Sequence, residues 1–218
     1  SSDLEEIPRF TGLNQTVKLD FLNPEEQVSE RLHIYKVCSP AKDKLETLYK
    51  LLCSLGDAST LVFCNHRESV DRVMKYLHSQ KVYCEAFHGG MEQDDREQAL
   101  YKFRNGSCHI LISTDLAARG LDIPEIRNIV HYHLPVGEDG FIHRNGRTAR
   151  WEAEGSAYLI LHSEEKLPSW LPEISEEYVL PEQLPKPALP KFVTLYIGKG
   201  KKDKINRIDI VGFLSKKG

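Results

Sequence analysis

Continuous apolar runs alternate with segments of helical periodicity between residues 32 and 162, and this alternation constrains the fold more than any other feature. Apolar residues recur at helical spacing between the runs, as at Leu45, Leu48 and Leu52. Strands that are apolar throughout are buried on both faces, so the pattern predicts an α/β three-layer sandwich around a mostly parallel sheet. The expected strands are LHIYKVCS (32–39), TLVFC (60–64), VYCEAFHG (82–89), HILIST (109–114), NIVHYHL (128–134) and SAYLILH (156–162).

The expected helices have recognisable ends. Ser39-Pro40 opens the first helix, with serine as the N-cap, and Gly56 ends it. Two more are predicted over 68–80 and 94–106. Parallel sheets carry ligand-binding loops at the carboxyl ends of their strands, so FCNHRES and TDLAARG are expected to be functional loops.

The segment HRNGRTAR (143–150) carries Arg144, Arg147 and Arg150 at intervals of three. On a helix this spacing places the three side chains near one another on one side. Like charges repel, so we expect a negative group opposite them.

The end of the chain differs from the body. Six of the eleven prolines lie between residues 168 and 190, which predicts a linker or surface segment outside the core. Residues 191–218 carry a net charge of +6 against −9 for the remainder, which favours a polyanionic partner or, alternatively, a merely solvated terminus. We expect a strand over 192–197 and then a helix with Ile205, Ile208 and Val211 or Gly212 facing inward.

The cysteines are five in number, scattered, and without a CxxC pair. They are expected to be buried apolar residues in a reducing compartment, not disulfides or metal ligands, so no metal site is predicted. No apolar run has the length of a membrane span, and the N-terminus does not resemble a secretory signal. We therefore expect a cytoplasmic protein without membrane partners.

Four segments together resemble motifs of the DEAD-box ATP-dependent RNA helicases, in the order of that family. LVFCNHRES (61–69) resembles motif IV, and HGGMEQDDR (88–96) resembles the HGxxxQxxR element. STDLAARGLDIP (113–124) resembles motif V, and HRNGRTAR resembles motif VI. The sequence contains no GxxxxGK[ST] phosphate loop and no Asp-Glu-Ala-Asp run, which in the family belong to a first RecA-like domain. The resemblance therefore implies the second, C-terminal RecA-like domain, with the fold of P-loop NTPases.

The resemblance also implies that ATP lies between the two RecA-like domains, with Mg²⁺ held by the first. Arg147 and Arg150 match the arginines that reach the γ-phosphate when the cleft closes, and a guanidinium fork suits phosphate oxygens. His143 matches the residue that communicates with the catalytic motifs of the first domain. For Arg144, a structural salt bridge is an equal alternative.

Two residues of motif V match nucleotide contacts of the family. Gly120 matches a position where the backbone approaches the nucleotide, and Asp122 matches the carboxylate that binds the ribose. A salt bridge between Asp122 and an arginine of residues 143–150 is the alternative.

Five positions match residues that line the RNA-backbone surface of the family: Arg67, Gly89, Gln93, Arg96 and Thr114. Contacts of this kind bind phosphate and sugar without choosing a sequence. Taken singly, each is equally compatible with an ordinary surface polar residue, and Thr114 with a strand-end cap. His66, Gly90, Asn145 and Ala149 depart from the usual Thr, Asp, Ile and Gly of the motifs.

These matches divide the chain into an interdomain linker or first-strand segment (1–29), the helicase domain (30–165), a Pro-rich linker (166–190) and a basic βα tail (191–218). The tail resembles the truncated start of the RRM-like RNA-binding domain of bacterial DbpA-type helicases.

The implied function is the C-terminal half of an ATP-dependent RNA helicase that unwinds short duplexes, with structured or ribosomal RNA as the expected substrate. The expected partners are RNA and the missing N-terminal RecA-like domain, and the chain is expected to be a monomer without ATPase activity of its own. The alternatives are a stand-alone non-catalytic RNA-binding module, a DNA-directed or remodelling helicase, and a generic nucleotide-binding protein.

Overall fold

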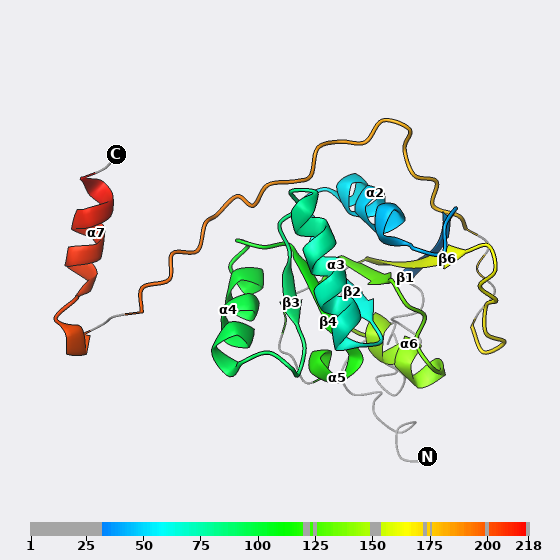
Figure 1. Ribbon diagram of the computed structural model, residues 1–218, viewed down its shortest axis with the longest axis horizontal. Coiled ribbons are helices and arrows are strands. Elements are labelled where there is room, and N and C mark those ends of the chain that lie inside the picture. Colours follow the sequence, from blue (N-terminus) through cyan, green and yellow to red (C-terminus); the bar gives the residue numbers. More distant parts are fainter. Residues whose placement is uncertain are drawn as a thin grey trace, which may run out of the picture.

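A computed structural model describes residues 32–119, 123, 126–148, 154–171, 174, 176–198 and 201–216. In these residues, one six-stranded sheet has the order β1-β6-β5-β2-β4-β3, and every pair of neighbouring strands is parallel (Figure 1). The strands are β1 (Leu32–Ser39), β2 (Thr60–Cys64), β3 (Glu85–Phe87), β4 (Ile110–Thr114), β5 (Asn128–His131) and β6 (Gly155–His162). All six expected strands are present, although β3 and β5 are shorter than the apolar runs suggested.

Helices cover both faces of the sheet. They are α2 (Leu45–Leu55), α3 (Arg67–Ser79), α4 (Gln93–Arg104), α5 (Asp115–Ala118) and α6 (Glu138–Asn145), whereas α7 (Arg207–Ser215) belongs to the tail. Alternate residues of β2 face opposite sides, because side chains of a strand alternate. Val62 packs in one cluster with α2 and α3, whereas Phe63 packs in another with α4 and α5. The predicted three-layer α/β arrangement is therefore confirmed.

The strand register aligns the ends that matter for function. Cys64 at the end of β2 pairs with Thr114 at the end of β4, and Phe63 pairs with His131 at the end of β5. Three central strands therefore finish at one edge of the sheet. The loops that follow them are brought together there, as expected for a parallel sheet.

Part of the Pro-rich segment belongs to the core, which corrects the prediction that it lies outside. Leu171 and Ile174 are buried with Phe141 of α6. Further on, Lys36 of β1 exchanges backbone hydrogen bonds with Glu176 and Tyr178 at 2.9 and 2.8 Å. The prolines prevent regular structure, but the apolar residues between them still cover the sheet edge and α6.

The tail forms its helix but not its strand. Residues 191–198 contain no strand, because they pair with no sheet neighbour; instead Thr194 binds Asn105 and Ser107 through side chains at 3.0 and 2.7 Å. Helix α7 begins with a capping box between Asn206 and Asp209. None of its residues is buried, so the inward orientation expected for Ile208 and Val211 is wrong (Figure 1 shows α7 apart from the sheet).

All five cysteines are free, and four are buried as predicted. Cys38 is the exception, since it is exposed at the end of β1. In the part of the chain that the structure describes, no group of His, Cys, Asp and Glu side chains has the arrangement of a metal site. No helix among these residues combines the length and apolarity needed to cross a membrane.

Candidate functional site

A cleft of about 310 Å³ opens at the carboxyl edge of the sheet, between the start of α5 and the end of α6. Arg119, His143 and Arg147 line it with two guanidinium groups and an imidazole. Its remaining lining comes from Phe63, Asp115, Ala118, Val136, Gly137, Asp139, Gly140 and Arg144. The cleft therefore joins motif V and motif VI, which lie about 30 residues apart in the sequence.

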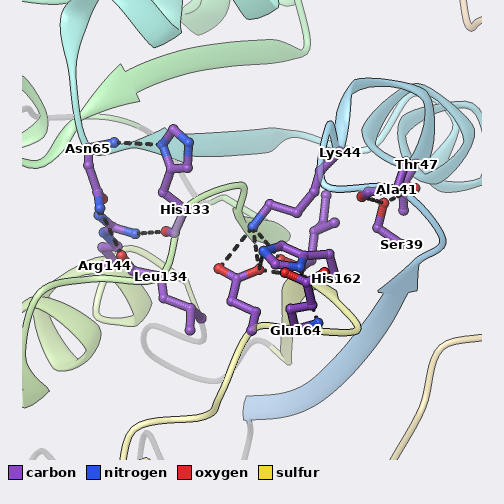
Figure 2. A network of polar contacts seen from close by, with 12 residues as sticks. Ser39, Ala41, Lys44, Thr47, Asn65, His133, Leu134, Arg144, His162 and Glu164 are labelled. Atoms are coloured by element: carbon purple, nitrogen blue, oxygen red, sulfur yellow. Dashed lines mark hydrogen bonds and ion pairs between the residues drawn. The ribbon is translucent and has the colours of Figure 1, made fainter.

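Arg144 forms the base of this cleft, and its side chain is only 1% exposed. Its Nε and Nη2 donate to the two carboxylate oxygens of Asp115 at 2.6 and 2.7 Å. Nη2 also donates to Asn65 Oδ1 at 2.8 Å, and Nη1 to the His133 carbonyl at 2.6 Å (Figure 2). A buried guanidinium with a bidentate partner ties three loops together. Arg144 therefore has the structural role that was one of its two alternatives.

Arg144 and Arg147 do not share a helix face, which corrects the prediction from spacing for this pair; Arg150 lies outside the described residues. Helix α6 ends at Asn145, and Gly146 and Arg147 form the turn that follows, with Arg147 N donating to the Arg144 carbonyl at 3.2 Å. Arg144 points into the body, whereas Arg147 is half-buried on the cleft lining. The negative group opposite Arg144 is Asp115; Asp122, the expected alternative, lies outside the described residues.

His131 lies behind the arginine and is fully buried. Its Nε2 is 3.0 Å from Asn145 Oδ1, and its ring stacks on Phe63 and Phe141 with centroids 6.5 and 5.3 Å apart. Burial, reinforced by the positive charge of Arg144, lowers the pKa of His131 to about 3. The imidazole is therefore neutral at physiological pH.

We expect this histidine to make stability depend on pH. A histidine whose pKa is lower when folded stabilises the fold fully above the unfolded value of about 6.5 and loses that contribution as pH falls toward the folded value. Below pH 6.5 the free energy of unfolding should drop by about 1.4 kcal/mol per pH unit from His131. Urea titrations between pH 7.5 and 5 of the wild type and of His131→Gln measure this as a difference in slope. Equal slopes for His131→Gln and the wild type would contradict the expectation.

The sequence-predicted nucleotide residues divide into two groups. His143 is exposed on the last turn of α6, and it lines the cleft together with Arg147. Gly120, Asp122 and Arg150 lie outside the described residues. Arg119 also lines the cleft.

The cleft suits the triphosphate of ATP only in part. Cationic side chains of its lining match phosphate oxygens, and the carboxylate of Asp115 is paired with Arg144, but the exposed carboxylate of Asp139 also lines the cleft. The chain has no phosphate loop to cradle the anion. The residues therefore fit one wall of a nucleotide site.

The sequence-predicted RNA residues all follow the carboxyl ends of β2, β3 and β4, which are neighbours in the sheet. Arg67 begins α3, Gln93 begins α4, and Gly89 is exposed in the loop before α4. In this structure Arg67 pairs with Glu68 at 3.0 Å, and Gln93 donates to Glu97 at 2.8 Å. These contacts are exposed and weak, so a phosphate can displace them.

Arg96 and Thr114 complete this edge. The Arg96 guanidinium lies 5.0 Å from the centre of the Phe87 ring, and its buried Nε has no hydrogen-bond partner among the described residues. Thr114 occupies the N-cap position of α5, but its side chain makes no capping hydrogen bond. Its hydroxyl is thus half-exposed beside the loop of motif V.

The departures from the family motifs have structural counterparts. His66 is the N-cap residue of α3 without a side-chain cap. Asn145, where the family commonly has Ile, is buried and bonds His131, although its Nδ2 has no partner in the described residues. The backbone N–H of Gly90 donates to His88 Nδ1 at 3.1 Å, and this hydrogen bond closes the turn at Gly90. Ala149 lies outside the described residues.

A second buried cation was not anticipated from sequence. Lys44 Nζ donates to the Ile160 carbonyl at 2.8 Å and to Glu165 at 3.0 Å, closing the end of β6 against α2 (Figure 2). Burial lowers the pKa of Lys44, and Glu165 opposes that shift. The partners are 121 residues apart, so no local pattern signals the pair. By contrast, Asp115 and Asn65 each directly follow a strand. Because residues at the carboxyl ends of parallel strands commonly form sites, this position in the sequence could have identified both residues as candidates.

Comparison with known proteins gives the family. The family model described as the helicase conserved C-terminal domain matches residues 43–152, which is half of the chain. The ATP-dependent RNA helicase MAK5 of Eremothecium gossypii is 40% identical over 154 residues, covering 66% of this chain and 20% of the relative. The MAK5 helicase of Candida albicans is 41% identical over 148 residues, covering 66% of this chain and 19% of the relative.

Solved structures of DEAD-box proteins are similar in fold to this chain. The C-terminal domain of the DEAD-box protein Dbp5 matches with a TM-score of 0.56 and 26% identity, over 62% of this chain and 79% of that one. The DEAD-box protein SrmB of E. coli, in a complex with the regulator of ribonuclease activity A, matches with a TM-score of 0.61 and 28% identity, over 74% of this chain and 98% of that one.

The chain therefore belongs to the helicase conserved C-terminal domain family, and it is the C-terminal RecA-like domain of a DEAD-box RNA helicase. The RecA-like fold expected from the motifs is confirmed. The chain spans about a fifth of the length of the MAK5 relatives that it matches. Those relatives are fungal, and they give no support to the bacterial affiliation that the resemblance of the tail to bacterial DbpA-type helicases implied.

Proposed function

We propose that this chain supplies one wall of the ATP site and half of the RNA track of an ATP-dependent DEAD-box RNA helicase. The observation that carries the proposal is the cleft in which His143 and Arg147 gather at the carboxyl edge of a sheet without a phosphate loop. Such a wall needs a second domain to cradle the phosphates and hold Mg²⁺. Relatives named ATP-dependent RNA helicases support this reading.

The proposed roles follow from charge and position. Arg147, together with Arg150, stabilises the negative charge that develops on the γ-phosphate oxygens. His143 contacts the catalytic motifs of the companion domain across the cleft. Gly120 and Asp122 contact the nucleotide and its ribose. Arg144 and Asp115 act indirectly, because they hold α6 against the loop of motif V.

The RNA side is proposed to bind backbone only. Arg67, Gly89, Gln93, Arg96 and Thr114 offer a guanidinium, an open backbone, an amide and a hydroxyl to phosphate and sugar. Binding of this kind gives affinity without sequence choice, which suits the unwinding of short duplexes in structured or ribosomal RNA.

The remaining proposals concern the whole protein. Residues 1–29 join the two RecA-like domains, residues 30–165 form the helicase domain, and residues 166–190 link it to residues 191–218, the start of a DbpA-type RNA-binding domain. The net charge of +6 on the last segment supports an RNA partner for it. We further propose a cytoplasmic monomer.

We expect the isolated 218-residue chain to hydrolyse ATP no faster than buffer, because it holds one wall of the site. The whole protein should hydrolyse ATP, and RNA should stimulate it. A coupled phosphate-release assay with and without RNA measures both. Helicase-like turnover by the isolated chain would contradict the divided site, and a whole protein that binds RNA without turnover would favour the non-catalytic alternative. A whole protein that unwinds DNA duplexes in preference to RNA would favour a DNA-directed helicase.

A further inference from the structure

His88 directly follows β3 and is buried, and both nitrogens of its imidazole have partners. Nδ1 lies 3.1 Å from the backbone N of Gly90, and Nε2 lies 2.9 Å from a carboxylate oxygen of Asp71. A backbone N–H can only donate, so Nδ1 accepts, and the ring proton lies on Nε2 and is donated to Asp71. One imidazole therefore joins the loop 88–91 to helix α3.

The two segments that His88 joins carry the proposed RNA contacts. Arg67 begins α3 and lies four residues before Asp71, so both are on the same helix face. The loop holds Gly89 and leads into the first turn of α4 with Gln93 and Arg96. The hydrogen bond from His88 to Asp71 links the two groups; it is partly buried, since the Asp71 side chain is 58% exposed.

The loop also passes close to the Arg67 side chain. A Cβ built on Gly90 would lie 3.3 Å from Arg67 Cδ and 3.2 Å from His88 Nδ1. Both distances are tighter than ordinary van der Waals contact, so glycine lets the loop approach the arginine stem closely. The Gly90 turn thus lies beside the stem of the Arg67 side chain, with no Cβ between them.

We infer that His88 is a positioning residue for RNA-backbone binding. It closes the Gly90 turn through Nδ1 and ties that turn to α3 through Asp71, so that Arg67 and the start of α4 face the same phosphates. The buried ring itself touches no ligand. The inference deepens the proposed RNA-binding function and rests on it.

Three variants separate the two contacts. His88→Asn keeps an acceptor for the Gly90 N–H, as in an Asx-turn, but is too short to reach Asp71. His88→Gln can reach Asp71 but offers no acceptor to Gly90. His88→Ala removes both. In the full 218-residue chain, we expect the Gly90 amide to exchange about tenfold faster in the Ala and Gln variants than in the wild type or the Asn variant.

Nuclear Overhauser contacts between Gly90 Hα and Arg67 Hδ report the geometry directly. They should be present in the wild type and lost in His88→Ala. Unchanged Gly90 exchange together with a retained contact in His88→Ala would overturn the positioning role.

Affinity for a fluorescently labelled oligouridine tests the link to RNA. His88→Ala should weaken binding about tenfold in the wild-type background and clearly less in an Arg67→Ala background, because the Arg67 contact that His88 positions is already absent there. A merely structural role would weaken binding equally in both backgrounds, and that result would overturn the inference. Absence of oligouridine binding by the wild type would overturn the proposed RNA function, whereas the exchange rates would still show whether His88 holds the loop.

Discussion

Replacing Asp115 with alanine is expected to destabilise the domain by about 3 kcal/mol, because it leaves the buried Arg144 guanidinium without its counter-ion. An arginine cannot become neutral by losing its proton inside a protein, so the charge must stay buried or pull α6 away from the sheet. Asp115 is 35% exposed, so water partly replaces the lost carboxylate and keeps the cost at the lower end for a broken buried pair. Urea denaturation followed by circular dichroism measures the free energy of unfolding.

Two further variants make this test specific. Asp139→Ala removes an exposed carboxylate from the first turn of α6 on the same cleft, and it should cost no more than about 1 kcal/mol. Replacing both partners, as in Asp115→Leu with Arg144→Met, should be less costly than Asp115→Ala, since no unpaired charge stays buried. A loss below 1 kcal/mol for Asp115→Ala would show that the pair does not hold the cleft together.

Replacing Arg147 with alanine in the whole protein is expected to lower kcat for RNA-stimulated ATP hydrolysis by about 10³-fold. The guanidinium stabilises charge that grows toward the transition state, so kcat should fall much more than KM rises. Arg147→Lys should restore little, because an ammonium keeps the charge but not the planar fork that fits two phosphate oxygens. Steady-state phosphate release at saturating RNA measures each constant.

Arg72→Ala is the matched control for this change. Arg72 is an exposed arginine of α3 that pairs with Asp43 at 2.6 Å, away from the residues that line the cleft, so turnover should be unchanged. The double variant of Arg147 and Arg150 should lose nearly all turnover. Full activity in that double variant would contradict the assignment of the cleft to ATP.

One structural prediction made from the spacing of residues in the helicase motifs is wrong. The regular spacing of Arg144 and Arg147 suggested a common helix face, yet the helix ends at Asn145 between them. Local spacing describes a face only where the helix continues, and the turn at Gly146 sends the two side chains to different environments. Arg144 consequently became a buried anchor, whereas Arg147 stayed on the cleft.

The predictions for the Pro-rich segment and for the strand of the tail were wrong for a related reason. Leu171 and Ile174 are buried although six prolines surround their region, because α6 and β6 leave an apolar surface that needs cover. Residues 192–197 have strand-like composition but no strand to pair with, so they form none. In both cases the conformation of the segment depends on the elements that it can pack against or pair with, and its own sequence does not specify these elements.

From its sequence alone this protein is an alternating α/β chain with parallel buried strands, because strands covered on both faces must be apolar throughout. The four motif segments, read in order, also determine the family. Only the tertiary structure decides which side chains meet: Arg144 with Asp115, Lys44 with Glu165, and His88 with Asp71. These pairs lie 17 to 121 residues apart, and strand order in the sheet, rather than any local pattern, brings their loops to one edge.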